Sequence, residues 1–409
     1  MHFPRSVVLA AVVAAAATLV APTPAGAETP AQALRKQFLA ALSSSTASAR
    51  AVVVTIDGAG TVVDDGGDRA LAPASTQKLY LTGAALVRMG PEYRLSTDVW
   101  GSGALLPEGT LAGDLVFVAG GDPSLTGVHL TELARQVRTA GVAHVTGSVF
   151  IDDSHFDRAR TAPGWKASWV PSQSGPLSAF ALDRNGWRRD RAFLDDPVPA
   201  NGQRFMDSLA QAGVAVDGGL QFGRPEAGVD LPLAEHLSPP LGDLVRSTLK
   251  SSDNFSAEQL LKELGAGDGE GSTAAGLRSV WQVAGGLGLP PGQAADGSGL
   301  SSQNRATAWH EVRWLTTLSA TEHGPRFVSS LAVSCTDGTL KNRFCRTPAA
   351  GKVQAKTGTL DNVVTLSGFT TTSAGHRAVF SVLLSGVKDS AKGRAAVDKA
   401  VTAIVTSRV

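Results

Sequence analysis

The chain has 409 residues, of which 43% are hydrophobic, 18% charged and 6% aromatic, with only 2 cysteines and 8 histidines. This apolar content excludes a disordered chain, and the length suits two or three domains. Without residues 1–27, which hold one charge, 36 basic and 36 acidic residues remain, so we expect no nucleic acid or anionic membrane as a partner. We also expect no metal site and no cofactor.

The first 27 residues have the layout of a secretory signal. Arg5 precedes an apolar run from Val7 to Val20, and the small residues 25–27 (Ala-Gly-Ala) form a cleavage site of the A-x-A type. We predict cleavage after Ala27, with an uncleaved anchor as the alternative. No later segment approaches the roughly 18 apolar residues of a membrane span. We therefore expect a secreted or extracytoplasmic protein, in the cell wall or periplasm, with no membrane span after cleavage.

Both ends of the chain carry apolar patterns of helices and strands that complement each other. The first segment reads as a helix, a buried strand and its hairpin partner, and the last segment as two core strands and a helix. We expect these elements to form one layered domain. They are Pro30–Leu42, Ala51–Ile56 and Thr61–Val63 at the start, and Leu366–Phe369, Ala378–Leu384 and the helix around Val397–Val405 at the end.

An insertion with its own pattern interrupts this domain. Asp114–Val118 reads as a strand, Leu130–Arg138 as a short helix and Val145–Asp152 as a second strand. We predict a signal peptide over 1–27, one domain made of 28–92 and 236–409, and an inserted domain over 93–235. The fold class is α/β (α+β).

Two cysteines stand ten positions apart near the end of the chain. Cys335 and Cys345 flank a turn-rich stretch at 336–338 (Thr-Asp-Gly). Outside the cytoplasm, such a pair can close a short loop by a disulfide. Two free thiols are the alternative.

A possible nucleophile stands in the stretch 75–78 (Ser-Thr-Gln-Lys). Ser75 and Lys78 share one face if a helix begins there, so a neutral lysine could accept the hydroxyl proton. Backbone N–H groups at a helix start could also stabilise an oxyanion. The S-x-x-K pattern recurs at Ser247–Lys250 and Ser385–Lys388, and for any single match a serine and a lysine on a solvated helix turn is the better explanation.

Two further motifs follow in order. The first, at 252–254 (Ser-Asp-Asn), places a hydroxyl and an amide two residues apart before an expected helix over Ala257–Leu264, although Ser302–Asn304 has the same S-x-N spacing. The second, at 356–358 (Lys-Thr-Gly), occurs once on an expected strand, Val353–Thr359. Its lysine supplies positive charge, its threonine a donor for a carboxylate, and its glycine room for close backbone approach.

The ordered set S-x-x-K, S-D-N and K-T-G resembles the D-alanyl-D-alanine carboxypeptidase/endopeptidase family of low-molecular-mass class C penicillin-binding proteins, peptidase family S13. The resemblance covers nearly the whole chain after residue 27. The 177 residues from Ser75 to Ser252 separate it from class A β-lactamases, which have no room there for an inserted domain. Stretches typical of the family stand at 120–125, 251–258, 296–301 and 337–340.

The resemblance implies a penicillin-binding/serine β-lactamase-like transpeptidase domain, in which helices flank an antiparallel sheet, with an inserted second domain. Many members nest a third domain inside the insertion. Here the chain runs quickly from Asn185 to Asn201, so that domain is expected to be shortened or absent.

The resemblance also implies a serine-type D-Ala-D-Ala carboxypeptidase, possibly also an endopeptidase, that acts on peptidoglycan stem peptides and is acylated by β-lactams. A non-catalytic wall-binding protein and a β-lactamase remain alternatives. The implied catalytic residues are Ser75 (nucleophile), Lys78 (proton acceptor), Ser252 (proton relay) and Asn254 (orientation). The implied substrate-binding residues are Lys356 and Thr357 for the carboxylate, Gly358 for close approach, and Thr359, whose N–H completes an oxyanion hole with that of Ser75.

Overall fold

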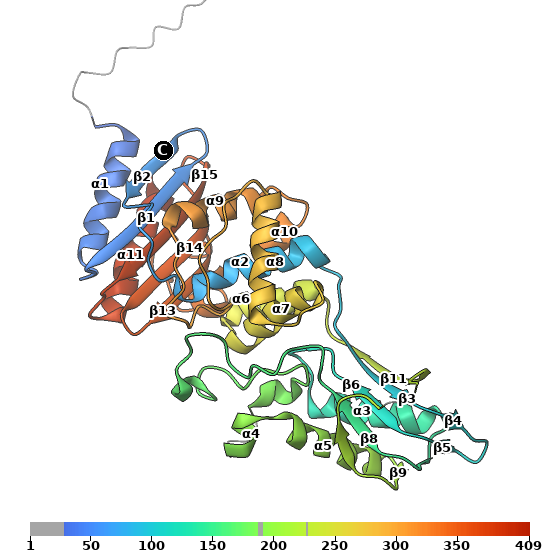
Figure 1. Cartoon of the computed structure of the whole chain (residues 1–409). Helices are drawn as coiled ribbons and strands as arrows, with labels where there is room; N and C mark the ends of the chain where they lie inside the picture. The colour runs from blue at the N-terminus through green and yellow to red at the C-terminus, as the bar shows by residue number, and fades with distance from the viewer. Residues whose placement is uncertain (1–27, 187–190, 226–227) are drawn as a thin grey trace, which may run out of the picture.

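The computed structural model of the chain describes residues 28–186, 191–225 and 228–409; the predicted signal peptide lies outside them. Figure 1 shows two bodies joined by a pair of chain crossings. We call residues 28–92 and 236–409 the core unit and residues 93–235 the inserted unit, and these boundaries stay a proposal. The strands that carry the crossings are β3 (Ser96–Gly101) and β11 (Leu231–Leu237), and they pair with each other.

The core unit is built on one antiparallel six-stranded sheet in the order β12-β13-β14-β15-β1-β2. As expected, strands from the two ends of the chain pair directly, because Val52 of β1 lies opposite Val382 of β15. The strands are β1 (Ala49–Ile56), β2 (Gly60–Asp65), β12 (Ala332–Val333), β13 (Gln354–Leu360), β14 (Val363–Thr371) and β15 (Arg377–Ser385).

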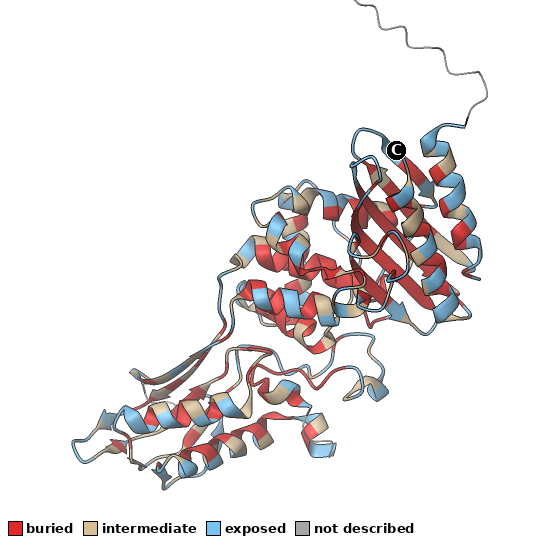
Figure 2. Ribbon diagram, turned by 180° about the vertical axis from the view of Figure 1, so that it is seen from behind, coloured by how far each residue is buried: buried red, intermediate tan, exposed pale blue. Residues whose placement is uncertain are grey.

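Helices cover both faces of this sheet, so its central strands β14 and β15 are buried along almost their whole length (Figure 2). Along β1, Val52 and Val54 pack with the two terminal helices, while Ala51 and Val53 pack with the helices of the opposite layer. The terminal helices are α1 (Pro30–Ser43) and α11 (Ser390–Thr406). The opposite layer comprises α2 (Lys78–Met89), α6 (Leu241–Ser251), α7 (Asn254–Ala266), α8 (Thr273–Gly286), α9 (Ala308–Ser319) and α10 (Gly324–Ser330).

The inserted unit has two sheets of its own, ordered β10-β8-β6-β3-β11 and β4-β5-β7-β9. Helices α3 and α5 pack on the larger sheet around an apolar core. The remaining elements are β4 (Ala104–Leu105), β5 (Thr110–Ala112), β6 (Leu115–Val118), α3 (Gly127–Thr139), β7 (His144–Val145), β8 (Val149–Asp152), α4 (Arg191–Asp195), α5 (Val198–Gln211), β9 (Ala215–Val216) and β10 (Leu220–Phe222).

The single strand that we expected over Val145–Asp152 is wrong. The structure has two strands there, β7 and β8, and they belong to different sheets. The chain changes sheets at Gly147, where an added β-carbon would lie 2.2 Å from Asp114 Oδ1 and 2.6 Å from the Gly113 carbonyl oxygen. Apolar residues on both sides of this break follow one pattern, so the pattern alone did not reveal it.

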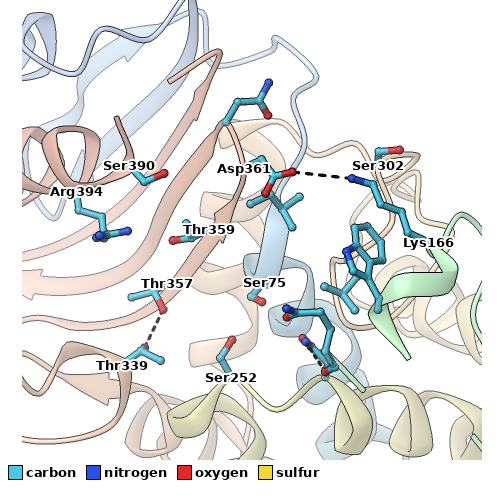
Figure 3. Close-up of a pocket in the computed structure, with 16 residues that line it drawn as sticks. Ser75, Lys166, Ser252, Ser302, Thr339, Thr357, Thr359, Asp361, Ser390 and Arg394 are labelled. Atoms are coloured by element: carbon cyan, nitrogen blue, oxygen red, sulfur yellow. Dashed lines mark hydrogen bonds and ion pairs between the residues drawn. The ribbon is translucent and has the colours of Figure 1, made fainter. Parts of the chain in front are cut away.

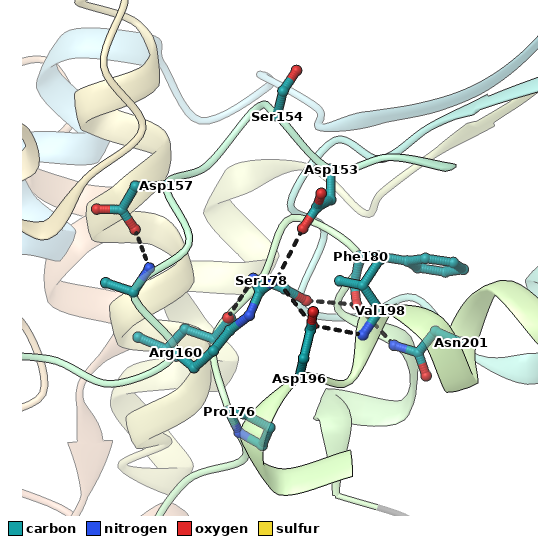
Figure 4. Close-up of polar contacts among 12 residues, drawn as sticks. Asp153, Ser154, Asp157, Arg160, Pro176, Ser178, Phe180, Asp196, Val198 and Asn201 are labelled. Atoms are coloured by element: carbon teal, nitrogen blue, oxygen red, sulfur yellow. Dashed lines mark hydrogen bonds and ion pairs between the residues drawn. The ribbon is translucent and has the colours of Figure 1, made fainter. Parts of the chain in front are cut away.

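A long connection, residues 153–186, leads from β8 toward α5 and reaches back to the core unit; we call it the arm. It contains the short 3-10 turns η2 (Ala167–Trp169) and η3 (Leu182–Asn185). Figure 4 shows Arg160 between two carboxylates, Asp153 at 3.1 Å and Asp196 at 2.9 Å, with a third bond to the Leu177 carbonyl. These bonds tie the two halves of the arm together at its base.

The region where the family nests a third domain is short in this chain. Between Asn185 and Asn201, the described residues form only α4 and the first turn of α5. Residues 187–190 lie outside the described part, so the expectation of a shortened or absent third domain stays a prediction.

Candidate active site

A cleft of about 810 Å³ opens between strand β13 and the arm, and all three motifs contribute to its wall (Figure 3). Ser75, Ser252, Asn254, Thr357 and Thr359 line it. The other predicted site residues, Lys78, Lys356 and Gly358, lie immediately behind this wall. The fold thus brings all eight together from segments more than a hundred residues apart.

The S-x-x-K motif stands on a 3-10 turn, η1 (Ala74–Gln77), that continues into α2. Lys78 Nζ donates a hydrogen bond to Ser75 Oγ at 3.0 Å, which is the shared face predicted from the spacing. The turn is anchored from below, because Thr76 Oγ1 donates to the buried carboxylate of Glu311 at 2.6 Å. Glu311 also accepts hydrogen bonds from Ser367 and Ser381 of the sheet. The predicted nucleophile, Ser75, therefore stands on a turn that buried hydrogen bonds tie to the sheet.

Lys78 is fully buried and makes two further bonds, to Asn254 Oδ1 at 2.8 Å and to the Ser298 carbonyl at 2.5 Å. Burial lowers the pKa of Lys78 to about 8, although the nearby carboxylates of Asp296, Glu258 and Asp253 oppose this shift. The neutral amine that proton transfer from Ser75 requires is therefore accessible close to neutral pH.

The S-D-N motif forms the tight junction between α6 and α7. Ser252 ends α6 in the left-handed conformation, with φ of 60°, and Asp253 caps α7 by accepting a bond from the Ser256 N–H. Asn254 is thereby the first residue of α7, which begins three residues before the helix expected over Ala257–Leu264. Its side chain joins two units, since Oδ1 accepts from Lys78 while Nδ2 donates to the Gln173 carbonyl of the arm at 3.1 Å.

Lys356 is fully buried on β13 and does not line the cleft. Its ammonium donates to Ser252 Oγ and to the Thr357 carbonyl, both at 2.8 Å. Burial, and then the like charge of Lys78, hold the pKa of Lys356 well below its usual range. We expected burial and the nearby Lys356 together to lower the pKa of Lys78. Burial accounts for the lowering, and the like-charge effect acts from Lys78 on Lys356 instead.

Gly358 lies where β13 meets the nucleophile turn. An added β-carbon would come within 2.2 Å of Thr365 Oγ1 and 2.9 Å of both the Ser75 nitrogen and the Pro73 carbonyl oxygen. No side chain fits there without displacing the turn that holds Ser75. The close approach expected for the glycine of K-T-G is thus a contact with the protein's own backbone.

Thr357 presents its hydroxyl to the cleft together with a second threonine, Thr339, which stands in the family-typical stretch 337–340 but to which no role was assigned. Thr339 Oγ1 lies 2.8 Å from Thr357 Oγ1, and both residues line the cleft. Thr339 belongs to the turn η4 (Gly338–Leu340), inside the loop that a Cys335–Cys345 disulfide closes. The predicted disulfide is confirmed, and the loop that it closes supplies part of the site.

Two buried carboxylates behind Lys78 were also missed. Glu258 and Asp296 are inaccessible to solvent and accept bonds from backbone N–H groups of the segment 297–301. Both stand in stretches that we singled out as typical of the family, at 251–258 and 296–301. The sequence pattern marked these two stretches but could not assign a role to Glu258 or Asp296, because a role depends on the atoms that each carboxylate contacts.

The arm supplies the opposite wall of the cleft. Lys166, Trp169 and Gln173 line it, and Lys166 Nζ lies 3.9 Å from Asp361, at the turn after β13 (Figure 3). Trp165 also reaches the core unit, because its Nε1 donates to Asp296 at 3.0 Å. Nothing in the apolar pattern of the arm indicated that it would complete the site.

The alternative S-x-x-K matches have other surroundings. Lys250 pairs with Asp337 and bonds to the Leu331 carbonyl, while Ser247 lies on α6. Ser385 ends β15. Neither serine lines the cleft, so the geometry distinguishes Ser75 from both.

Metal ligation and membrane crossing find no support in the described residues. No group of three or more His, Cys, Asp or Glu side chains is arranged to hold a metal ion in this part of the chain. Over the same residues, no helix is both long and apolar enough to cross a membrane.

Comparison with known sequences gives consistent matches. A model of the D-Ala-D-Ala carboxypeptidase 3 (S13) family matches residues 36–189 and 193–406. A D-alanyl-D-alanine carboxypeptidase of Actinomadura sp. (strain R39) is 28% identical over 416 residues, covering 82% of this chain and 77% of that protein. The D-alanyl-D-alanine carboxypeptidase DacB of Haemophilus influenzae is 24% identical, covering 80% of this chain and 82% of that protein.

Solved structures show that the fold is shared. Penicillin binding protein 4 (dacB) from Haemophilus influenzae gives a TM-score of 0.79 at 20% identity, over 89% of this chain and 98% of that one. The same protein complexed with a novel β-lactam gives 0.73 at 22% identity, over 90% and 98%. The expected fold class, an α/β penicillin-binding fold with helices flanking an antiparallel sheet, is confirmed.

Proposed function

The chain belongs to the D-Ala-D-Ala carboxypeptidase 3 (S13) family, and we propose that it works through an acyl-enzyme formed on Ser75. It is a serine-type D-Ala-D-Ala carboxypeptidase. One observation supports this assignment of residues above all: Ser75, Lys78 and Asn254 form a hydrogen-bonded chain beside the Lys356–Ser252 pair, in the cleft that carries all three motifs.

The proposed first step is attack by Ser75 Oγ on the carbonyl carbon between two D-alanines of a peptidoglycan stem peptide. The hydroxyl proton passes to the neutral amine of Lys78, 3.0 Å away. Backbone N–H groups of Ser75 and Thr359 stabilise the oxyanion, as the family resemblance implies. Among the described residues, β13 beyond Ala355 pairs only with β14, which leaves its cleft-side edge open to a peptide.

Collapse of the tetrahedral intermediate breaks the C–N bond and releases the terminal D-alanine. Ser252, held by Lys356, relays the proton to the departing amine. Water then attacks the acyl-enzyme, which restores Ser75 and releases the shortened peptide. The terminal carboxylate binds near Thr357, with the charge of Lys356 behind it.

The ring amide and the neighbouring carboxylate of a β-lactam resemble the scissile amide and the terminal carboxylate of the stem peptide. We therefore propose that β-lactams acylate Ser75. The substrate requires the protein to work outside the cytoplasm, which agrees with the signal predicted over residues 1–27.

The test is intact mass after incubation with penicillin, followed by mapping of the modified peptide, together with D-alanine release from a stem pentapeptide. The expected result is one adduct on Ser75 and release of D-alanine. Rapid turnover of penicillin without a lasting adduct would indicate the β-lactamase alternative. Absence of both the adduct and D-alanine release would indicate the non-catalytic alternative.

A further inference from the structure

Glu258 is a buried carboxylate on the same helix as Asn254, one turn further along. Its oxygens accept hydrogen bonds from the N–H of Gly297, at 3.1 and 3.2 Å, and from the N–H of Ser298 at 2.7 Å. The side chain is inaccessible to solvent. Among the described residues, no ion pair involves it. Burying a carboxylate without a salt bridge costs free energy, so we expect a role for Glu258 beneath the segment 297–301.

Glu258 is connected to the proton acceptor through a single residue. The N–H of Ser298 donates to Glu258, and the carbonyl of the same residue accepts from Lys78 Nζ at 2.5 Å. Gly299 then packs against the nucleophile turn, where an added β-carbon would meet the Ala74 carbonyl oxygen at 1.8 Å. Movement of this segment would therefore disturb Lys78 and Ser75 together.

We propose that Glu258 is a positioning residue for proton transfer, which holds the Ser298 carbonyl against Lys78 and whose negative charge controls how readily Lys78 releases its proton. This inference rests on the proposed function, in which neutral Lys78 accepts the proton of Ser75.

Other charged groups near Glu258 and Lys78 also act on the pKa values of these two residues. Asp296 and Asp253 act with Glu258 to favour the proton on Lys78, while Lys356 on β13 is the like charge. Burial, and then the charge of Asp296, raise the pKa of Glu258 to about 7, and the charge of Glu258 also acts on Lys262. Because the pKa of Lys78 is about 8, the two groups titrate in the same range and their protonation is coupled.

The test measures the rate of penicillin acylation against pH for the wild type and for Glu258→Gln. The amide oxygen of glutamine can still accept from Ser298 and Gly297, while the negative charge is lost. Neutral Lys78 should then persist to lower pH, so the acidic limb of the profile should move down by about one pH unit. The plateau at high pH should stay within about tenfold of the wild type.

Glu311→Gln is the matched control. It also neutralises a buried carboxylate beneath the nucleophile turn, but Glu311 contacts Thr76 and is not among the charges that shift the pKa of Lys78. Its acidic limb should stay in place. An unmoved limb in Glu258→Gln, or equal movement in both variants, would overturn the proposal.

Glu258→Asp covers the case in which the glutamine variant does not fold. Aspartate keeps the charge but is one methylene too short for the 2.7 Å contact, so the plateau should fall at least tenfold with the acidic limb unmoved. A downward shift of that limb would contradict the inference. A wild-type adduct that maps away from Ser75 would instead contradict the proposed function, so the two failures are distinguishable.

Discussion

Lys356 donates a hydrogen bond to Ser252 at 2.8 Å, so the strand of the K-T-G motif and the turn of the S-D-N motif are joined through one side chain from each. The lysine is buried behind the cleft, and it is Ser252 that reaches the surface. In the proposed function, Lys356 therefore does not touch the substrate and acts on it only from behind a hydroxyl layer formed by Ser252 and Thr357.

Ser75→Ala should abolish both D-alanine release and covalent labelling by penicillin, because the attacking oxygen is removed. The buried contacts of the turn, from Thr76 to Glu311, do not involve the Ser75 hydroxyl, so the unfolding temperature should stay within about 2 °C. Mapping of the wild-type adduct provides the check. An adduct on Ser247 or Ser385 would show that the wrong S-x-x-K serine was chosen.

Acylation of the wild type should increase as the pH rises through about 8, where Lys78 loses its proton. Lys356→Ala should lower the rate by about one to two decades on a substrate with a free carboxylate, because it removes the bond to Ser252 and the amine behind Thr357, a loss on the order of 1.5–3 kcal/mol. A neutral ester analogue should lose less. The acidic limb should stay in place, because burial and not Lys356 lowers the pKa of Lys78.

Lys356→Arg is the matched variant, since it keeps the charge in a planar fork. It should preserve part of the preference for the carboxylate while losing rate, because the buried space around Ser252 fits an ammonium. Acylation rates against pH, with one acidic and one neutral substrate, test both variants. Equal losses on both substrates would mean that Lys356 only supports the strand.

Gly358→Ala should reduce acylation of Ser75 by at least tenfold. The new methyl group would lie 2.9 Å from the Ser75 nitrogen and 2.2 Å from Thr365 Oγ1, so the nucleophile turn must shift. Gly285→Ala is the control, because its β-carbon would meet nothing within 4 Å and it lies within helix α8. That variant should be as active as the wild type and slightly more stable, by about 1 kcal/mol. Similar activity of the two variants would contradict the close-packing argument.

Replacing Cys335 and Cys345 by serine should lower the free energy of unfolding by about 2–3 kcal/mol, the effect expected for a loop of this length. Because the loop carries Thr339 beside Thr357, acylation by carboxylate substrates should also slow. Denaturant unfolding with and without reductant measures the first effect. If reductant changes neither the stability nor the rate of the wild type, the disulfide has no such role.

Replacing residues 96–237 by a short Gly/Ser linker should leave a core that folds. The ends already lie together, since the Ser238 N–H donates to the Leu95 carbonyl at 2.9 Å. Acylation should fall at least tenfold, however, because Asn254 loses its bond to Gln173 and Asp296 loses its bond to Trp165. Far-ultraviolet circular dichroism, cooperative unfolding and penicillin labelling provide the readouts.

The shortened chain should be made with the additional substitution Lys262→Met. The same substitution in the full chain is the control. The ammonium of Lys262 is buried against Asp157 and the Ala159 carbonyl of the arm, and the excision would leave it unpaired. Loss of cooperative unfolding in the shortened double variant would show that the core depends on the inserted unit. Undiminished labelling would show that the arm contacts do not matter for catalysis.

The sequence by itself determined the features that depend on local spacing and on apolar periodicity. A spacing of three residues from Ser75 to Lys78 puts the two groups on one helical face. The apolar runs Ala51–Ile56 and Ala378–Leu384 require burial on both sides, which a shared sheet provides. Cys335 and Cys345 are only ten positions apart, and a separation this short allows a bridge whatever the rest of the chain does.

Tertiary structure alone decided the contacts between residues that are distant in the sequence. The link from Glu258 through Ser298 to Lys78, the threonine pair of 339 and 357, and the arm that holds Asn254 each join separate elements. Apolar periodicity predicts which face of an element is buried, but it does not say which element will cover that face. Partners for buried polar atoms are therefore set only when the elements pack, and in this protein those partners complete the site around Ser75.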